Sequence, residues 1–282
     1  DTIQSRGLGD VYKRQDNYEK LFSRRSYAKM FSASLTYVLI VVPISVALGL
    51  GSALLISSLR IGNELYKAIF FLPVMATLLA MAIVWEFALN PIMGVVNDIL
   101  RSGCDKRLIN GFFTGAWYGA DPLQSWYGTA CADKFPIWLG DKRYALGTIA
   151  FIGIWQGFGF NMVLYLAGLT SVPRELYQAA HMDGADSAWE RFKLVTWPML
   201  GPTHVFVITI SSIRSFQVFD TVEALTEGGP SKSTYVMVYA MFEKGVRQNL
   251  LGIGSAITIV FLAFVLVLTL IQVYFVNRRV HY

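Results

Sequence analysis

Two long uncharged apolar runs constrain this chain more than any other feature. One covers residues 31–57 and the other covers residues 250–276. Each exceeds the roughly 20 apolar residues that a helix needs to cross a bilayer. Pro43 and Gly49 in the first run are compatible with such a helix, since both residue types are tolerated in membrane-spanning helices. The runs predict an all-α fold, a polytopic membrane helical bundle.

Three further segments bring the expected number of spans to five. Residues 68–89 carry only Glu86 near their end, and residues 145–169 are uncharged and rich in glycine. Residues 203–225 form the weakest of the five, because Arg214 and Asp220 lie within them. All five are expected to be helices, since irregular backbone facing lipid would leave polar groups unsatisfied.

Composition agrees with a membrane protein and excludes several other classes. Apolar residues make up 54% of the 282 residues and charged residues 15%, whereas about a quarter of a soluble chain is charged. The net charge of +5 is spread over the polar segments, so no nucleic-acid partner is expected. Two cysteines and three histidines predict neither a disulfide framework nor a metal site. Cys104 and Cys131 form either one bridge or two free thiols.

The polar segments between the runs differ in kind. Residues 90–144 are long, aromatic and glycine-rich, which is typical of a cap on the membrane interface, and we expect an extended periplasmic insertion there. Residues 170–202 are polar and predicted to be helical. Residues 1–15 are patternless: they are either a disordered tail or foreign sequence in place of a native N-terminus. Residues 16–282 are then the transmembrane domain.

The distribution of positive charge gives two conflicting topologies. Lys and Arg before the first run favour a cytoplasmic N-terminal end, which would place residues 170–202 outside. Arg278 and Arg279 favour a cytoplasmic C-terminal end, which places the same residues inside. We adopt the second topology, because loss of a first span would invalidate the N-terminal signal.

Residues 172–185 carry the signals of a short helix that ends in a turn. Pro173 suits the first turn of a helix, and Gly184 suits a left-handed stop just past its end. The small residues Ala179, Ala180 and Ala185 lie near the bend and would allow another protein to approach closely.

A second short helix is expected directly after this turn. Ser187 and Glu190 have the spacing of a capping box, and the helix should extend to about residue 196. Pro198 and Pro202 are then expected to break the chain before the next span. Two capped helices predict a projecting helix–turn–helix; the alternative is a mere connector between spans.

This segment resembles the cytoplasmic coupling loop of binding-protein-dependent ABC transporter permeases. Their signature is Glu-Ala-Ala, three residues, Gly, and a distal Pro. The positions that match are Ala179, Ala180, Asp183, Gly184 and Ala185. Gln178 replaces the signature Glu, and Pro198 lies about one residue further along than the pattern places it.

The resemblance extends over residues 17–282 apart from an insertion at residues 104–136. The carbohydrate branch, with the maltose and glycerol-3-phosphate permeases, is similar at Asn90-Pro91, Gly94, Asn97, residues 225–230 and residues 278–282. Members usually have six core spans, which implies that one has been lost here. The resemblance implies the transmembrane domain of a type I ABC importer in the bacterial inner (plasma) membrane.

The resemblance also implies the partners. The loop would dock on a cytoplasmic ABC ATPase dimer, with Glu175 and Asp183 carrying contacts that Gln178 has lost. A second permease subunit, a periplasmic solute-binding protein and membrane lipid complete the set. No G-x-x-x-x-G-K-[ST] motif occurs, and residues 229–234 lack its second glycine. The chain is therefore expected to be a non-catalytic subunit without a cofactor, and ATP-Mg would be bound by the ATPase.

Polar residues within the spans are candidates for the substrate pathway. An ionisable group inside a bilayer costs about 2.5–3.5 kcal/mol on insertion scales, so it usually faces a cavity or a partner. Arg214 and Gln217 share one helical face, and Asp220 continues it. The alternative is that Arg214 pairs with Asp220 or Glu86 and braces the bundle. In the maltose permeases that this chain resembles, the corresponding span contacts the sugar, which implies by position a substrate pathway at Arg214, Ser215, Gln217 and Val218. We add three residues of the 145–169 span, because aromatic faces and amides suit sugar rings and hydroxyls: Asn161, Gln156 and Trp155.

We therefore expect a permease subunit of an ATP-driven importer for a sugar, an oligosaccharide or a glycerol-3-phosphate-like solute. The alternative is an ion-coupled secondary carrier. That class would show acidic residues in mid-span and inverted repeats, and neither is evident. A membrane-embedded enzyme would need a cluster of histidines or of His and Glu on a span, which the sequence lacks.

Overall fold

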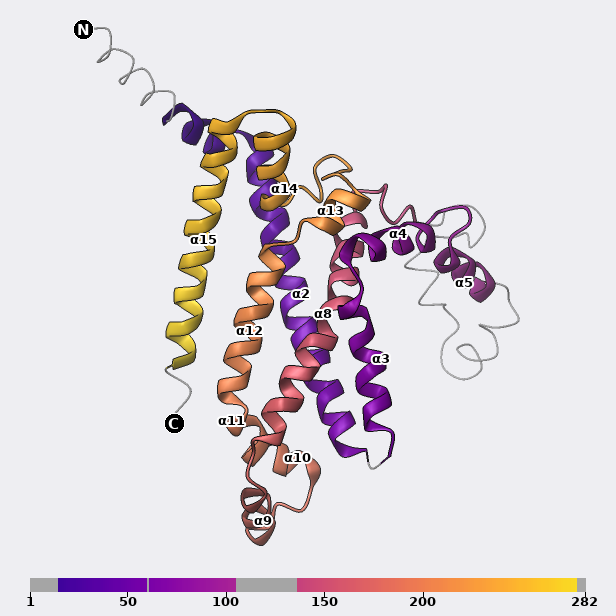
Figure 1. Cartoon of the computed structure of the whole chain (residues 1–282), viewed down its shortest axis with the longest axis vertical. Helices are drawn as coiled ribbons and strands as arrows, with labels where there is room; N and C mark the ends of the chain where they lie inside the picture. Colours follow the sequence, from indigo (N-terminus) through magenta and orange to yellow (C-terminus); the bar gives the residue numbers. More distant parts are fainter. Residues whose placement is uncertain (1–14, 60, 105–135, 278–282) are drawn as a thin grey trace, which may run out of the picture.

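The computed structural model describes residues 15–59, 61–104 and 136–277. Within these ranges the chain forms helices and turns without a strand. Four long helices follow the long axis of the molecule in Figure 1: α2 (Arg25–Ser58), α8 (Ala145–Thr170), α12 (Gly201–Phe216) and α15 (Leu251–Asn277). The expected all-α membrane bundle is confirmed.

The span expected over residues 68–89 is not one straight helix. The structure divides it into α3 (Asn63–Met75) and α4 (Leu78–Ala88), which are bent by 98° relative to each other. Ala76 and Thr77 between them are extended, and the Thr77 side chain accepts a hydrogen bond from the backbone N–H of Ala80. This N-cap starts a new helix in a new direction. In the described ranges four helical segments are long and apolar enough to cross a membrane, with residues 201–225 taken as one segment, or five if this bent pair counts as one span.

The span expected over residues 203–225 is also interrupted. Helix α12 ends at Phe216, and α13 (Asp220–Leu225) begins after a short break. The N–H of Gln217 closes the end of α12 by donating to the carbonyls of Ile213 and Arg214. The face expected to join Arg214, Gln217 and Asp220 along one helix is therefore wrong, because helical geometry stops at residue 216.

Helix α8 lies between its neighbours and packs on α2, α3 and α12. Small residues permit the closest contacts. A Cβ on Gly49 of α2 would lie 2.6 Å from the Cβ of Asn161, and one on Gly168 of α8 would lie 2.5 Å from Oγ1 of Thr203. Lipid tails are as apolar as leucine side chains, so the hydrophobic effect does not drive helices together within the bilayer. Close packing of this kind supplies much of the attraction instead.

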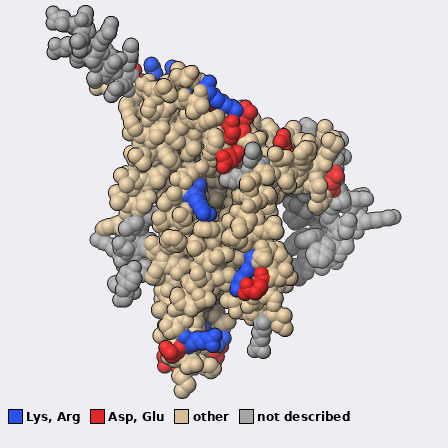
Figure 2. Space-filling model, in the orientation of Figure 1, with Lys and Arg blue, Asp and Glu red and all other residues tan. Residues whose placement is uncertain are grey.

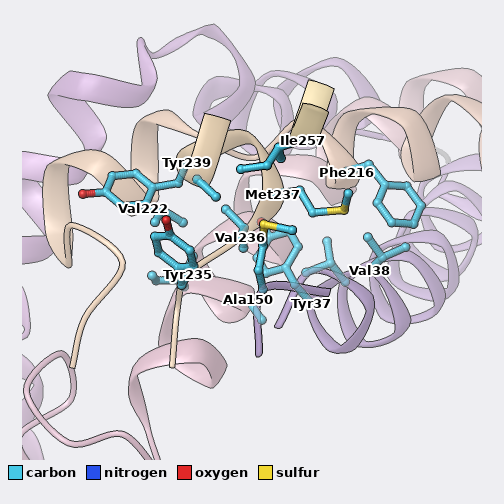
Figure 3. Packing of buried hydrophobic residues seen from close by; sticks show 14 of the residues in the cluster. Tyr37, Val38, Ala150, Phe216, Val222, Tyr235, Val236, Met237, Tyr239 and Ile257 are labelled. Atoms are coloured by element: carbon cyan, nitrogen blue, oxygen red, sulfur yellow. The ribbon is translucent and has the colours of Figure 1, made fainter. Parts of the chain in front are cut away.

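The main apolar core joins α2, α8, α12 and α15 to a shorter helix, α14 (Met237–Phe242). Figure 3 shows Val236 and Met237 among the side chains of Tyr37, Phe216 and Ile257. The backbone N–H that begins α14 is also satisfied there, because Met237 donates to the Ser34 hydroxyl at 2.9 Å. The start of α14 is therefore fixed to the first long helix.

The described flanks of the expected insertion at residues 90–144 lie at the same end of the molecule as α13 and α14 (Figure 1). Helix α5 (Val95–Cys104) follows the turn at Asn90. The indole N–H of Trp138 donates to the Asn97 side chain at 2.8 Å, and the Trp138 carbonyl accepts from Thr148 of α8 at 3.3 Å. These bonds connect both flanks to the bundle. Residues 105–135, including Cys131, and the side chain of Cys104 lie outside the described part.

Charge is distributed as a membrane protein requires. Figure 2 shows a face on which uncharged surface predominates and charged side chains gather mainly toward the two ends. Charged side chains also lie between the ends: a blue one next to a red one, and a blue one beside a hollow. A charge at that depth is costly unless it borders a polar cavity or a partner.

Candidate functional site

A cavity of about 490 Å³ opens between α2, α8 and α12, close to the break between α12 and α13. Its walls come from α2, from the end of α3, from one face of α8, and from residues 211–221. The two interrupted helices contribute to the lining where they break. Irregular backbone at membrane depth is tolerated where it is buried in protein or lines a water-filled cavity. The cavity therefore explains how both helices can break at this depth.

The cavity brings together the six residues expected for the substrate pathway. Asn161 and Gln156 reach it from α8, and the others reach it from the end of α12 and the break after it: Arg214, Ser215, Gln217 and Val218. Trp155 does not line it and packs edge-on against Trp85, with ring centroids 5.5 Å apart. Sequence reasoning missed the aromatic lining by Tyr37, Phe160 and Phe219. The polar residues Ser45 and Ser211, which also line the cavity, were the available signal within the apolar runs.

Asn161 lines the cavity, but the protein itself uses its amide. Its Nδ2 donates to the Ser45 hydroxyl at 3.4 Å, and its Oδ1 accepts from the Ser211 hydroxyl at 2.9 Å. The residue is 2% exposed. Asn161 therefore joins α8 to both α2 and α12, and bracing the cavity wall explains its burial better than direct contact with a solute.

Gln156 has a comparable bracing contact. Its Nε2 donates to the carbonyl of Ala76 at 3.5 Å, at the long end of the range for such bonds. Ala76 is the C-cap of α3, where the helix break leaves carbonyls without a helical partner. The Gln156 side chain thus partly satisfies the break and borders the cavity at the same time.

Arg214 is the cation of the cavity lining. Its guanidinium carbon lies 3.8 Å from the centroid of the Phe160 ring, which is a cation–π contact. Asp220 lines the same cavity, yet no ion pair joins Arg214 to Asp220 or Glu86 among the described residues. The alternative that Arg214 braces the bundle through one of these carboxylates is therefore wrong. Its guanidinium lies against an aromatic ring and borders the cavity.

The segment 170–202 projects from the opposite end of the bundle from α13 and α14 (Figure 1). It contains α9 (Arg174–Met182), α10 (Ala188–Arg191), a π-helical turn η1 (Phe192–Thr196) and α11 (Trp197–Met199). This segment is called the coupling loop below. The expected helix–turn–helix is present.

The helix stop and the capping box expected in the coupling loop are both present. Gly184 has φ +89°, the left-handed conformation that ends α9, and nothing lies within 4 Å of a Cβ placed there. The capping box is complete: the Glu190 N–H donates to the Ser187 hydroxyl at 3.1 Å, and the Ser187 N–H donates to the Glu190 carboxylate at 3.0 Å. Hydrogen bonds from the Ser187 backbone and side chain to the carboxylate hold the pKa of Glu190 below its ordinary value. Pro173 is the N-cap of α9, one position before the expected first turn.

The small residues at the bend serve the loop itself. Ala180 and Ala185 are buried and pack with Val172 and Val195. The expectation that they are open to another protein is wrong for these two, because short side chains are what let α9 approach the second helix. The other residues expected to contact the ATPase are exposed: Glu175, Gln178, Ala179, Asp183, Gly184 and Pro198.

Pro198 does not break the chain. The helical path continues through it to Met199, and the break falls at Leu200, with φ −77° and ψ 1°. A proline inside a helix lacks an N–H and crowds the preceding turn. The π-helical turn before it, in which the Trp197 N–H donates to the Phe192 carbonyl, widens the backbone where that crowding would occur. Pro202 then lies in the first turn of α12.

Side-chain contacts that the sequence did not indicate hold the loop together and connect it to the spans. The hydroxyls of Tyr177 and Thr196 share a hydrogen bond at 3.0 Å, which ties α9 to the second helix. Nδ1 of His204 and the hydroxyl of Tyr165 lie 3.0 Å apart, between α12 and α8. Two polar aromatic residues near span ends were the only signal. In the described ranges, no group of three His, Cys, Asp or Glu side chains could hold a metal ion.

The comparisons with known proteins agree with this geometry. The profile of the family described as "Binding-protein-dependent transport system inner membrane component" matches residues 19–281. The sn-glycerol-3-phosphate transport system permease protein UgpA of Brucella abortus biovar 1 (strain 9-941) is 29% identical over 98% of this chain and 84% of its own length. The probable ABC transporter permease protein YurN of Bacillus subtilis (strain 168) is 27% identical over 92% of this chain and 80% of its own.

A solved structure shares the fold. A chain of a bacterial ABC transporter involved in the import of the acidic polysaccharide alginate superimposes with a TM-score of 0.74 and 21% sequence identity, covering 93% of this chain and 83% of that chain. A chain of a bacterial alginate ABC transporter in complex with an alginate pentasaccharide-bound periplasmic protein gives a TM-score of 0.71 at 21% identity, covering 93% of this chain and 81% of that chain. The chain is thus a multi-pass permease subunit of an ABC importer and belongs to the family of binding-protein-dependent transport system inner membrane components.

Proposed function

We propose that this permease, in a bacterial inner membrane, moves a sugar, an oligosaccharide or a glycerol-3-phosphate-like solute through the cavity around Arg214. A periplasmic binding protein would deliver the solute, a second permease subunit would close the pathway from the other side, and an ATPase dimer bound at the coupling loop would drive it. The observation that carries the proposal is the pairing of a cavity at the helix breaks with a rigid loop at the opposite end of the same helices.

The lining of the cavity supports a hydroxylated solute. It combines amide and hydroxyl groups with the rings of Tyr37, Phe160 and Phe219, and ligand sites typically join apolar surface to a few such polar groups. Arg214 adds a planar cation whose forked N–H donors fit carboxylate or phosphate groups. Relatives named for glycerol-3-phosphate and for an acidic polysaccharide support keeping anionic solutes within the class.

The coupling loop supports docking on a separate ATPase. Its exposed outer residues Glu175, Gln178 and Asp183 offer polar contacts, and Met182 and Trp189 are 88% and 70% exposed. Exposed apolar side chains at the centre of a polar surface are typical of a protein interface. The chain itself carries no nucleotide-binding motif, so ATP-Mg would be bound by that partner.

Reconstitution in proteoliposomes tests the assignment. Purified alone, the chain should neither hydrolyse ATP nor take up solute, and both activities should appear when the ATPase, the second permease and the loaded binding protein are added. Uptake driven by an ion gradient through the chain alone would instead identify the secondary carrier and refute the proposal.

A further inference from the structure

Five rings form a continuous row from the surface of the coupling loop into the bundle. The rings of Trp189 and Phe192 are stacked with centroids 5.5 Å apart, and Trp197 follows at 5.9 Å from Phe192. His204 lies 4.4 Å from Trp197, and Tyr165 lies 5.3 Å from His204. All four spacings are those of rings in contact. We call these five residues the aromatic ladder.

The two ends of the aromatic ladder lie in different environments. Trp189 on α10 is 70% exposed, whereas Tyr165 on α8 is fully buried. Tyr165 packs in an apolar cluster with Ile56 of α2, with Leu200 at the N-cap of α12 and with Val207 of α12. The ladder therefore leads from the surface of the loop into a cluster that three long helices share.

The residues along this path are closely packed and hydrogen-bonded to one another. The Tyr177–Thr196 hydrogen bond and the packing of Ala180 against Val195 make the loop one unit. At the base of the loop, Gly168 has no room for a Cβ against Thr203. Close-packed interiors are barely compressible and transmit displacement, so a movement of the loop must displace α8 and α12.

The path continues to the cavity on the same helix faces. Tyr165 and Asn161 are four residues apart on α8, and His204 and Ser211 are seven apart on α12, spacings that place each pair on one face. The two faces are joined by two polar contacts: Tyr165 with His204 at 3.0 Å, and Asn161 with Ser211 at 2.9 Å. The Tyr165–His204 contact lies near the coupling loop, and the Asn161–Ser211 contact lies in the cavity wall.

We propose that the aromatic ladder transmits movement of the coupling loop to the cavity, and that His204 is the positioning residue at which it enters the bundle. This inference rests on the proposed docking of the loop on an ATPase. Nε2 of His204 is buried without a hydrogen-bond partner. The ring thus has one polar anchor, to Tyr165, and its contact with Trp197 is the connection to the loop.

The test uses the assembled transporter in proteoliposomes, with its ATPase, second permease and loaded binding protein. Trp197→Ala and His204→Ala should each lower solute uptake and binding-protein-stimulated ATP hydrolysis about tenfold, the order expected for loss of a coupling contact. Co-purification of the ATPase should stay at the parent level. The control is Phe206→Ala, which removes a ring that is 56% exposed on the same helix and should change neither activity.

Conservative variants separate transmission from a folding defect. His204→Phe keeps a ring against Trp197 but loses the hydrogen bond to Tyr165, and Trp197→Phe keeps a ring of smaller size; both should retain most of the uptake. His204→Asn can keep the hydrogen bond but lacks the ring, and should be as defective as His204→Ala.

Each other outcome overturns the inference. Uptake at the parent level in Trp197→Ala and His204→Ala would show that the ladder transmits nothing. Loss of ATPase co-purification in these variants would show that the rings only shape the docking surface. If His204→Phe were as defective as His204→Ala, ring contact would not be the coupling element. Failure of the docking proposal itself is seen separately, as normal ATPase association of Gly184→Leu.

Discussion

Arg214 at the end of α12 places its guanidinium carbon 3.8 Å above the centroid of the Phe160 ring of α8, at the wall of the central cavity. The ring face carries the negative part of the aromatic quadrupole and partly compensates the charge. It leaves the N–H donors in the plane of the guanidinium available. An arginine held in this way can bind an anionic or hydroxylated group without first breaking an ion pair.

The first prediction concerns that arginine. Arg214→Gln should lower uptake of the solute carried by the cognate binding protein about 10- to 100-fold, because a hydrogen bond to a charged group contributes about 1.5–3 kcal/mol. Uptake by Arg214→Lys should lie between that of Arg214→Gln and that of the parent. Lysine keeps the charge, but its ammonium group neither stacks on a ring nor offers a planar pair of N–H donors. Lys142→Gln removes a charge on an exposed residue outside the cavity and serves as the control. Equal uptake by Arg214→Gln and the parent would remove Arg214 from the pathway.

Asn161 should matter more for stability than for affinity. Asn161→Leu removes its bonds to Ser45 and Ser211, and we expect a loss of about 1–2 kcal/mol, given the modest value of hydrogen bonds between membrane helices. Ser211→Ala removes one of the two bonds and should cost about half as much. Thermal unfolding of the detergent-solubilised protein measures both. A variant as stable as the parent would contradict the bracing role.

Gly49 and Gly51 of α2 form a matched pair. A Cβ at Gly49 would lie 2.6 Å from the Cβ of Asn161, whereas nothing lies within 4 Å of one at Gly51. Gly49→Ala should therefore destabilise the bundle by about 1–3 kcal/mol through overpacking. Gly51→Ala should be neutral or stabilise it by up to about 1 kcal/mol, because alanine favours the helix. The same unfolding assay compares them, and equal effects would show that α2 and α8 do not approach closely.

Gly184→Leu should leave membrane insertion intact but weaken association with the ATPase. A residue with a Cβ in the left-handed conformation costs about 1–2 kcal/mol, and the φ of +89° leaves no relaxed alternative for the turn. Gly184→Asn should be milder, because asparagine adopts this conformation more readily. Quantitative co-purification of the ATPase measures the effect. Full recovery of the ATPase with Gly184→Leu would argue against docking at this turn.

The capping box makes the start of α10 sensitive to pH. Hydrogen bonds from the Ser187 backbone and side chain lower the pKa of Glu190 in the folded loop. A lowered pKa adds stability above the unfolded value, and this is lost as the pH falls through the folded value. Amide hydrogen exchange at residues 188–191 should therefore accelerate, after correction for intrinsic rates, as the pH falls below about 4.5.

Glu190→Gln is the control for this pH dependence. It cannot lose a charge, so its corrected exchange rates should not change over the same pH range. Ser187→Ala should expose these amides at every pH, because losing an N-cap typically costs about 1 kcal/mol. A parent protein whose protection is flat through this range would show that the carboxylate contributes nothing to the cap.

Several features could be predicted from the sequence because they depend on neighbouring residues. The uncharged run at residues 31–57 falls within α2, and the run at residues 250–276 falls within α15 except for its first residue. The left-handed Gly184 and the Ser187–Glu190 box depend on residues within a turn of one another. Local backbone geometry and hydropathy decide such features, and these are properties of a short segment.

Contacts between distant segments were decided only by the tertiary structure. Ala180 and Ala185 looked open to a partner but are buried, because α9 folds back on the second helix. For Arg214, the alternative to a role in the pathway was an ion pair with Asp220 or Glu86, whereas the guanidinium lies on the Phe160 ring. The residues at 68–89 bend between α3 and α4, and α12 ends before Gln217. Which polar group meets which partner depends on how helices far apart in sequence pack together, and hydropathy carries no information about that.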